Sequence, residues 1–293
     1  MFRSGFVSVV GRPNVGKSTL VNALVGGKVA ITSDKPQTTR SAIRGILDAP
    51  DAQAVLVDTP GYHKPRTALG ERLNQVVREA WSDVDLAIFV VDGRAGIGRG
   101  DERVAADLGA AGRRTFCVVN KIDLLGRQGI AAGLVAASKL GDFEAFVPVS
   151  AKAGEGVDTL TRLILDGLPE GPLYYPPGTQ SDQPPPLFVA ELVREKLLRR
   201  TQDELPHSIA VITEDYEERD DGLLEIRANI FVERDSQKGI VIGRRGGTIK
   251  LVGTEAREEI ETLFGRRVFL DLRVKVEKDW QRRPQSLHRL GFS

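Results

Sequence analysis

The sequence predicts an α/β domain, with a mostly parallel sheet covered by helices on both faces, followed by a smaller α+β domain. Strand-like and helix-like segments alternate from Gly5 to Leu168, which is the pattern of parallel strands joined by crossover helices. Seven of the 15 prolines then fall within residues 169–186, a composition typical of a semi-extended linker. We therefore expect one domain at 1–168, a linker at 169–186 and a second domain at 187–293.

The bulk composition narrows the class of protein. Of the 293 residues, 41% are hydrophobic and 28% are charged, as in ordinary globular proteins, and no apolar run is long enough to cross a membrane. The first strand follows the N-terminus too closely to leave room for a signal peptide. The single cysteine, Cys117, excludes an intrachain disulfide and lies in an apolar run, so we expect an inert core residue. Together these features favour a cytoplasmic protein.

A phosphate-binding loop is expected between the first strand and the first helix. Residues 11–18 match the pattern G-x-x-x-x-G-K-[ST] at every fixed position, between a strand at 6–10 and a helix at 18–25. The loop amides and the helix N-terminus would face phosphate oxygens. Lys17 would place its charge against the outer phosphates, and the Ser18 hydroxyl would bind Mg²⁺. The residues expected to contact nucleotide are Gly11, Arg12, Pro13, Asn14, Val15, Gly16, Lys17, Ser18 and Thr19.

Two further segments complete the expected metal and phosphate site. Residues 35–40 form a loop after the first helix, in which we expect Thr39 rather than Thr38 to close over Mg²⁺. An apolar strand at 55–58 ends in Asp58, which would hold Mg²⁺ through water, and the Gly61 N–H would contact the γ-phosphate. The residues expected here are Asp58, Thr59, Pro60, Gly61 and Tyr62.

Two later segments predict that the base is guanine. Asn120–Asp123 follows an apolar strand at 115–119, so it lies at the carboxyl end of a strand, where open α/β sheets bind ligands. The Asp123 carboxylate can accept hydrogen bonds from the guanine N1–H and 2-amino group, whereas adenine offers neither donor in that arrangement. A strand at 145–149 then precedes the second segment, residues 150–152, which would supply backbone contacts to the base. The expected residues are Asn120, Lys121, Asp123, Ser150, Ala151 and Lys152.

The C-terminal half predicts a different kind of domain. The expected elements are a helix at 187–202, strands at 207–213 and 224–233, a short helix, a glycine turn, a helix at 248–264 and a strand at 267–277. The order α-β-β-α-α-β matches a type II KH domain. The acidic stretch 214–221 is expected to be a solvated hairpin loop.

The glycine turn, Gly243-Arg244-Arg245-Gly246, predicts binding of single-stranded RNA. Its glycines would let a nucleic-acid backbone approach closely, and its arginines add positive charge. The whole chain carries a net charge of only +1, but residues 238–293 hold 13 basic and 7 acidic side chains. The expected RNA contacts are Lys238, Gly243, Arg244, Arg245, Gly246, Lys250, Arg266 and Arg267. Trp280 and the basic tail 281–293 either pack beside the groove or touch RNA.

With five nucleotide motifs in this order, residues 5–168 resemble a translation-factor-type GTPase domain. The segments 11–18, 35–40 and 58–65 resemble those of the Era family of bacterial GTPases, and the KH-like half extends the resemblance over essentially the whole chain. The resemblance implies hydrolysis of GTP to GDP and phosphate, with Mg²⁺ as cofactor. It also implies binding to the 3′ end of 16S ribosomal RNA and a role in assembly of the small (30S) ribosomal subunit, and we expect a monomer.

One departure from Ras-like GTPases affects catalysis. Tyr62 stands where those proteins carry a water-orienting Gln, so we expect slow intrinsic turnover, with catalysis resting on Asn14, Lys17, Thr39 and Gly61. In several relatives, an Asn at the position of Asn14 helps to hold K⁺, which makes K⁺ a second expected cofactor.

Two alternatives stay open. One is an RNA-binding module in which nucleotide acts as a switch and hydrolysis is incidental. The other is a membrane-peripheral signalling GTPase, because Era-like proteins are also found at the inner membrane.

Overall fold

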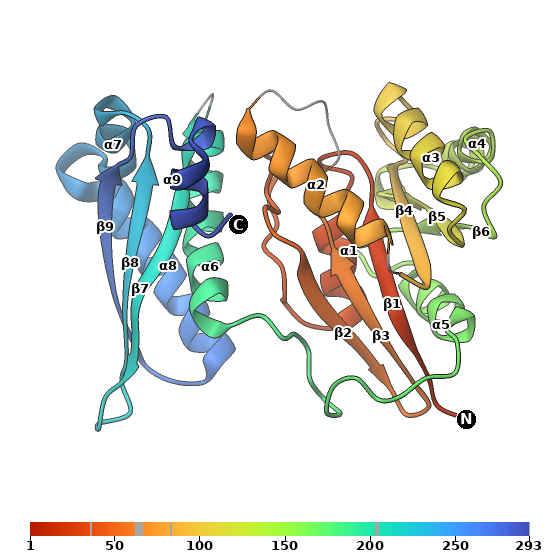
Figure 1. Cartoon of the computed structure of the whole chain (residues 1–293), viewed down its shortest axis with the longest axis horizontal. Coiled ribbons are helices and arrows are strands. Elements are labelled where there is room, and N and C mark those ends of the chain that lie inside the picture. Colours follow the sequence, from red (N-terminus) through yellow and green to blue (C-terminus); the bar gives the residue numbers. More distant parts are fainter. Residues whose placement is uncertain (36, 62–66, 83, 203–204, 293) are drawn as a thin grey trace. The chain divides into compact units, whose positions relative to one another are not determined.

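The computed structural model describes residues 1–35, 37–61, 67–82, 84–202 and 205–292, and the chain divides into two compact units (Figure 1). The first unit holds most of residues 1–182. The second holds the chain from 183 onward together with two short segments of the N-terminal half.

The first unit is built on a six-stranded sheet with the order β2-β3-β1-β4-β5-β6. β2 pairs antiparallel with β3, and the other neighbouring strands pair in parallel. The strands are β1 Arg3–Val10, β2 Ile43–Ala49, β3 Ala52–Asp58, β4 Leu86–Asp92, β5 Thr115–Asn120 and β6 Ala145–Val149. The helices are α1 Lys17–Val25, α2 Ala68–Ser82, α3 Arg99–Ala111, α4 Arg127–Ser138 and α5 Val157–Gly167, with a short 3-10 helix, η1, at Ile122–Leu124.

Alternating side chains of the strands bury two apolar layers, one on each face of this sheet. In β4, Leu86, Ile88 and Val90 belong to a layer that includes side chains of α1 and α5. Ala87, Phe89 and Val91 belong to the other layer, with side chains of α3 and α4. Because helices cover both faces of the sheet, the strands are continuous apolar runs rather than alternations of apolar and polar residues. The predicted α/β fold, mostly parallel and covered on both faces, is confirmed.

Cys117 lies in the second of these layers and is fully buried. Burial raises the pKa of its thiol to about 12, so the thiolate is scarcely formed at neutral pH. The side chain therefore acts as a small apolar core residue.

The segment that follows α5 is bound along the first unit, and we call residues 170–182 the strap. Glu170 and Ser181 form isolated bridges with Arg3 and Gly45. The Ile46 N–H also donates to the Gln180 carbonyl at 2.9 Å. Most of the expected linker 169–186 therefore lies against the first unit, in contact with β1, β2 and β3.

Gln53 of β3 makes the central contacts to the strap. Its side chain is fully buried. Oε1 accepts the N–H groups of Tyr174 and Tyr175 at 3.1 and 2.9 Å, while Nε2 donates to the Tyr175 carbonyl at 3.0 Å. One side chain thus satisfies three backbone groups of the strap.

The second unit contains a three-stranded sheet in the order β7-β8-β9, with β8 antiparallel to β7 and parallel to β9. The strands are β7 Ala210–Glu218, β8 Leu224–Val232 and β9 Val268–Val276. The helices are α6 Pro185–Arg200, α7 Asp235–Ile242, α8 Gly247–Phe264 and α9 Pro284–Arg289, with 3-10 helices η2 Leu205–Ser208, η3 Arg244–Gly246 and η4 Trp280–Arg282. The helices α6 and α8 contact each other and the sheet. The predicted KH order, α-β-β-α-α-β, is confirmed.

The α6 helix begins at Pro185, inside the expected linker. Proline suits a first helical turn, where its missing N–H would have no helical partner.

The prediction of a hairpin loop at 214–221 is wrong for its first five residues, because β7 continues to Glu218. Cations from the other two strands of the sheet pair with these acids. Glu214 pairs with Lys275 of β9 at 3.0 Å, and Asp215 pairs with Arg227 of β8 at 3.2 Å. Cross-strand ion pairs of this kind stabilise strands that local composition disfavours.

Trp280 packs inside the second unit. Its side chain is fully buried, and Nε1 donates to the Ser208 carbonyl at 3.0 Å. Its ring stacks on Phe292 with centroids 5.5 Å apart. Of the two alternatives for Trp280, the structure therefore shows packing.

We expect Gln53→Ala to lower the free energy of unfolding by about 2 kcal/mol, because it leaves buried backbone groups without partners. Protease cleavage within residues 170–182 should become faster as the strap loosens. Urea unfolding and limited proteolysis measure the two effects. Gln128→Ala, at an exposed site on α4, is the matched control and should change neither. A strap that stays protected in Gln53→Ala would contradict the central role of Gln53.

Candidate functional site

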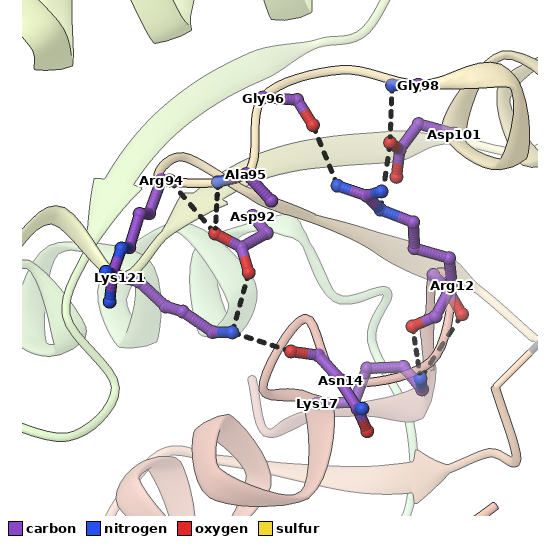
Figure 2. Close-up of polar contacts among 11 residues, drawn as sticks. Arg12, Asn14, Lys17, Asp92, Arg94, Ala95, Gly96, Gly98, Asp101 and Lys121 are labelled. Atoms are coloured by element: carbon purple, nitrogen blue, oxygen red, sulfur yellow. Dashed lines mark hydrogen bonds and ion pairs between the residues drawn. The ribbon is translucent and has the colours of Figure 1, made fainter. Parts of the chain in front are cut away.

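The loop at residues 11–18 joins β1 to α1 at the carboxyl edge of the parallel sheet. Gly16 caps α1 with φ of 96°, and Asn14 also lies in the left-handed region with φ of 64°. The Lys17 side chain is only 6% exposed. Its Nζ donates to the carbonyls of Gly11 and Arg12 at 3.2 and 3.0 Å, so the ammonium group lies over the loop (Figure 2).

Burial strongly affects the two charged groups at the centre of this site. It lowers the pKa of Lys17 from 10.5 to about 8, although Asp58 favours the charged ammonium. It also raises the pKa of Asp58, against the opposing effects of Ser18, Lys17, Thr39 and the Thr59 backbone. Both charges would be better satisfied by a phosphate beside Lys17 and a cation beside Asp58.

Three oxygen-bearing side chains from separate loops meet at the end of the phosphate loop. Ser18 Oγ donates to Asp58 Oδ2 at 2.6 Å and lies 2.9 Å from Thr39 Oγ1. Thr39 Oγ1 also donates to Asp58 Oδ2 at 3.3 Å. The other carboxylate oxygen, Asp58 Oδ1, is buried without a hydrogen-bond partner among the described residues. This donor set fits a hard divalent cation such as Mg²⁺.

The structure distinguishes the two threonines of the 35–40 loop. Thr38 Oγ1 donates to the Lys35 carbonyl at 2.6 Å, whereas Thr39 faces Ser18 and Asp58. Of the two threonines, Thr39 is therefore the one whose hydroxyl group joins the oxygen cluster that could hold a metal.

The expected base-binding loops are tied to the phosphate loop by direct hydrogen bonds. Asn120 Nδ2 donates to the Val15 carbonyl at 2.8 Å, and Asn120 Oδ1 accepts the Ala151 N–H at 3.0 Å. Lys121 Nζ donates to the Asn14 carbonyl at 2.6 Å. The loops after β1, β5 and β6 are therefore joined.

Asp123 is oriented by the last of these loops. Its Oδ1 accepts the Ser150 hydroxyl at 2.6 Å, and the residue itself is exposed. Ser150 is buried, whereas Lys152 is exposed. The carboxylate is thus held in place while it stays open to a base.

The segment after β3 lies against the phosphate loop. Thr59 Oγ1 donates to the Val9 carbonyl at 2.8 Å. A Cβ on Gly61 would lie 2.7 Å from the Pro13 Cα, so this close approach requires glycine. Tyr62, the last contact expected in this segment, lies outside the described residues.

Sequence reasoning missed two acidic residues beside this site, Asp92 and Asp101. Asp92 ends the apolar strand β4, as Asp58 ends β3, so the same signal could have found it. Asp101 lies within the first turn of α3 and carries no comparable sequence signal.

In the second unit, the glycine turn joins α7 to α8. Gly243 has φ of 74°, and a Cβ there would lie 2.2 Å from Thr248 Oγ1, so only glycine fits without movement. Arg244 and Arg245 are both exposed. The turn therefore presents two cations beside the start of α8.

A groove of about 300 Å³ lies between α8 and β9. Its lining combines apolar side chains with the cations Lys250 and Arg257, which suits stacked bases beside a phosphate backbone. The lining residues are Ile249, Lys250, Gly253, Thr254, Arg257, Leu270 and Leu272. Sequence reasoning named Lys250 and missed the others, because the pairing of α8 with β9 is a tertiary feature.

Not all of the expected RNA contacts lie near the turn. Lys238 lies on α7, which leads into it. Arg266 and Arg267 follow α8, whose 18 residues separate them from the turn by about 27 Å of helix. Arg266 also pairs with Glu218 at 2.7 Å.

Together, the fold and the two sites define a P-loop GTPase followed by a KH domain. A family model described as 50S ribosome-binding GTPase matches residues 6–121, and a KH domain model matches residues 204–281. The chain belongs to the Era family of GTPases, and it hydrolyses GTP to GDP and phosphate.

Similar proteins of this family match over their full length. GTPase Era of Mycolicibacterium smegmatis is 51% identical over 99% of both chains. GTPase Era of Streptomyces coelicolor is 52% identical over 99% of this chain and 95% of its own. A crystal structure of an Era variant from Aquifex aeolicus bound to GDP and AlF₄⁻ has a TM-score of 0.96 at 35% identity, with both chains fully covered. A crystal structure of Era with MgGDPNP and nucleotides 1506–1542 of 16S ribosomal RNA has a TM-score of 0.96 at 36% identity, again with both chains fully covered.

Among the described residues, the structure contains no helix with the length and apolar character that a membrane span requires.

The lowered pKa of Lys17 predicts that GDP affinity falls as pH rises. In the protein without nucleotide, Lys17 has a pKa of about 8, so it is mostly charged at pH 7 and mostly neutral at pH 8.5. Bound phosphates favour the charged form, so GDP binding takes up a proton near pH 8, and affinity should fall about fourfold between these pH values. Calorimetry in two buffers of different ionisation enthalpy measures both the affinity and the proton uptake.

Lys17→Arg is the control, because a guanidinium stays charged throughout this range. Its GDP affinity should change with pH by less than about twofold. An equal fall in both proteins would show that a group other than Lys17 is titrating.

Proposed function

We propose that this GTPase binds the 3′ end of 16S ribosomal RNA through its KH domain and acts in assembly of the small ribosomal subunit. The observation that carries the proposal is the groove between α8 and β9, whose lining includes Ile249 and Lys250 in the first turn of the helix that follows the exposed Arg244 and Arg245. The similar Era structure that contains nucleotides 1506–1542 of 16S ribosomal RNA supports this choice of RNA.

The proposed nucleotide contacts follow from the geometry of the first unit. Residues 11–19 would surround the phosphates, and Lys17 would neutralise the outer ones. Asp123, held by Ser150, would accept hydrogen bonds from guanine. Asn120 and Lys121 would hold the base-binding segment 120–123 in place against the phosphate loop, through their hydrogen bonds to Val15 and Asn14.

Ser18, Thr39 and Asp58 would hold Mg²⁺, which a similar Era structure contains together with GDPNP. When bound, the metal supplies charge stabilisation to the β- and γ-phosphates. The chain itself supplies the Lys17 ammonium and, at Gly61, an N–H that would contact the γ-phosphate. Thr39 would join the site only when the 35–40 loop is closed, which links nucleotide state to loop position.

The proposed second cofactor is K⁺, held in part by Asn14. This residue is exposed, and its backbone carbonyl accepts a hydrogen bond from Lys121. A cation there would supply charge stabilisation in a site that has no water-orienting Gln after Gly61.

If Asn14 helps to bind K⁺, GTP turnover should be faster in KCl than in NaCl at equal ionic strength. Asn14→Ala should remove the difference and leave the slower rate, because the side-chain oxygen is lost. Phosphate release measured in both salts checks this. Equal rates of the unchanged protein in the two salts would exclude K⁺ as the charge stabiliser.

In the KH domain, the Gly243–Gly246 turn would approach the RNA backbone while bases enter the groove. Replacing both Arg244 and Arg245 by Asp should abolish RNA binding, because two negative charges would face the phosphates at their closest approach. GTP affinity should stay within about twofold, since the turn shares no residue with the nucleotide site. Binding to an RNA of the 3′ end of 16S ribosomal RNA measures the first effect, and nucleotide titration measures the second.

The matched control is the replacement of Arg282 and Arg283 by Asp, which makes the same charge change on the exposed tail. That variant should retain RNA binding. If instead the tail variant loses binding and the turn variant keeps it, the tail is the RNA site. Thermal melting establishes that each variant is folded.

The membrane-peripheral alternative differs in its partner. Cosedimentation with small ribosomal subunits supports the proposal, whereas flotation with lipid vesicles, without binding to subunits, would favour the alternative. RNA binding that leaves GTP turnover unchanged would favour a nucleotide-switched module with incidental hydrolysis.

A further inference from the structure

The segment between β4 and α3, residues 92–101, is joined to the phosphate loop by two ion pairs, one directly to Arg12 and one through Lys121 (Figure 2). Asp92 ends β4, and Asp101 lies in the first turn of α3. Arg12, which pairs with Asp101, belongs to the loop itself. Lys121, which pairs with Asp92, donates to the carbonyl of Asn14.

The first pair is built around a buried carboxylate. Asp101 is fully buried, and its Oδ2 lies 3.0 Å from Arg12 Nε. The same oxygen accepts the Gly98 N–H at 3.0 Å, which caps α3. Arg12 Nη2 also donates to the Gly96 carbonyl at 2.7 Å. The guanidinium is therefore held at two points by one segment, and Asp101 has both a capping role and a pairing role.

The second pair fixes the other side of the loop. Asp92 Oδ1 accepts the N–H groups of Arg94 and Ala95 at 2.9 and 3.0 Å. Its Oδ2 accepts Lys121 Nζ at 2.6 Å. Burial opposes ionisation of Asp92, but Lys121 and these amides outweigh it and lower its pKa. The carboxylate is thus charged, and it holds Lys121 in the position from which Lys121 donates to the loop.

Between the two attached positions, 12 and 14, lies Pro13, which contacts Gly61. Asn14 has φ of 64°, a sparsely populated conformation that persists where neighbours enforce it. Movement of Arg12 would shift both the contact of Pro13 with Gly61 and the position of Asn14. Those are the parts of the loop that face the γ-phosphate in the function proposed above.

We propose that Asp101 is a positioning residue for GTP hydrolysis, acting through Arg12 to hold residues 12–14 in the catalytic arrangement. Asp92 holds the same residues through Lys121. The proposal rests on the proposed roles of Asn14 and Gly61 in the reaction. It predicts that losing the Asp101 pair impairs turnover more than it impairs binding of GDP, which lacks a γ-phosphate.

A double-mutant cycle tests the proposal with Asp101→Asn, Arg12→Gln and the double variant. Asn can still accept the Gly98 N–H, so the helix cap is kept while the ion pair is lost. We expect Asp101→Asn to lower kcat about tenfold, while GDP affinity stays within about twofold. In the Arg12→Gln background, the same substitution should change kcat by less than about twofold, because its partner is already absent.

Glu102→Gln is the matched control. Glu102 is exposed in the same turn of α3, so this variant removes the same charge without touching Arg12, and its kcat should equal that of the unchanged protein. Equal effects of Asp101→Asn in both backgrounds would overturn the proposal, since they would reflect the cap alone. An unchanged kcat in Asp101→Asn would also overturn it.

If Asp101→Asn does not fold, Arg12→Gln and Arg12→Lys carry the test. Arg12→Gln should lower kcat with GDP affinity retained, and Arg12→Lys should restore part of kcat, because an ammonium can still pair with Asp101. A kcat in Arg12→Gln equal to that of the unchanged protein would overturn the proposal. If instead the proposed role of Asn14 in the reaction is wrong, Asn14→Ala would leave kcat unchanged even where the double-mutant cycle shows coupling. The two kinds of failure therefore give different results.

Discussion

The nucleotide site depends on the parallel alignment of β1, β3, β4, β5 and β6, which brings five carboxyl ends to one edge of the sheet. Parallel strands need crossover helices, and those helices cover both faces with apolar side chains. The loops at this edge are therefore carried by a rigid core. That is how Lys17, Asp58 and Asn120 each come to hydrogen-bond a residue of the phosphate loop, 11–18.

The same edge concentrates buried charge, which is costly without partners. The free energy of that burial is visible in the lowered pKa of Lys17 and the raised pKa of Asp58. A phosphate beside Lys17 and a cation beside Asp58 would compensate these buried charges, so the cost of burying them would be recovered as binding energy. The ion pairs of Asp92 and Asp101 differ, because both partners of each pair belong to the chain and their contacts hold the loop.

In the second unit, the Gly243–Gly246 turn places exposed cations at the start of a helix instead of burying charge. Gly243 permits a sharp change of direction beside Thr248, and α8 begins directly after the turn. The groove then extends along α8 and β9, so affinity for a strand of RNA can be spread over backbone contacts at one end and stacking along the rest. The strap, held by Gln53, leaves little of the expected linker free of the first unit.

The sequence by itself determined the motifs and the fold class, because each depends on local pattern: glycines and Lys17 at fixed spacing, acids at the ends of apolar strands, and the order of elements. The sequence favoured Thr39 over Thr38 only as an expectation. It carried no signal for the Arg12–Asp101 pair, whose partners are far apart in the chain. Tertiary structure decided those contacts, the strand at 214–218 and the binding of the strap. In each case the stabilising partner lies on another element, where composition and periodicity carry no information about it.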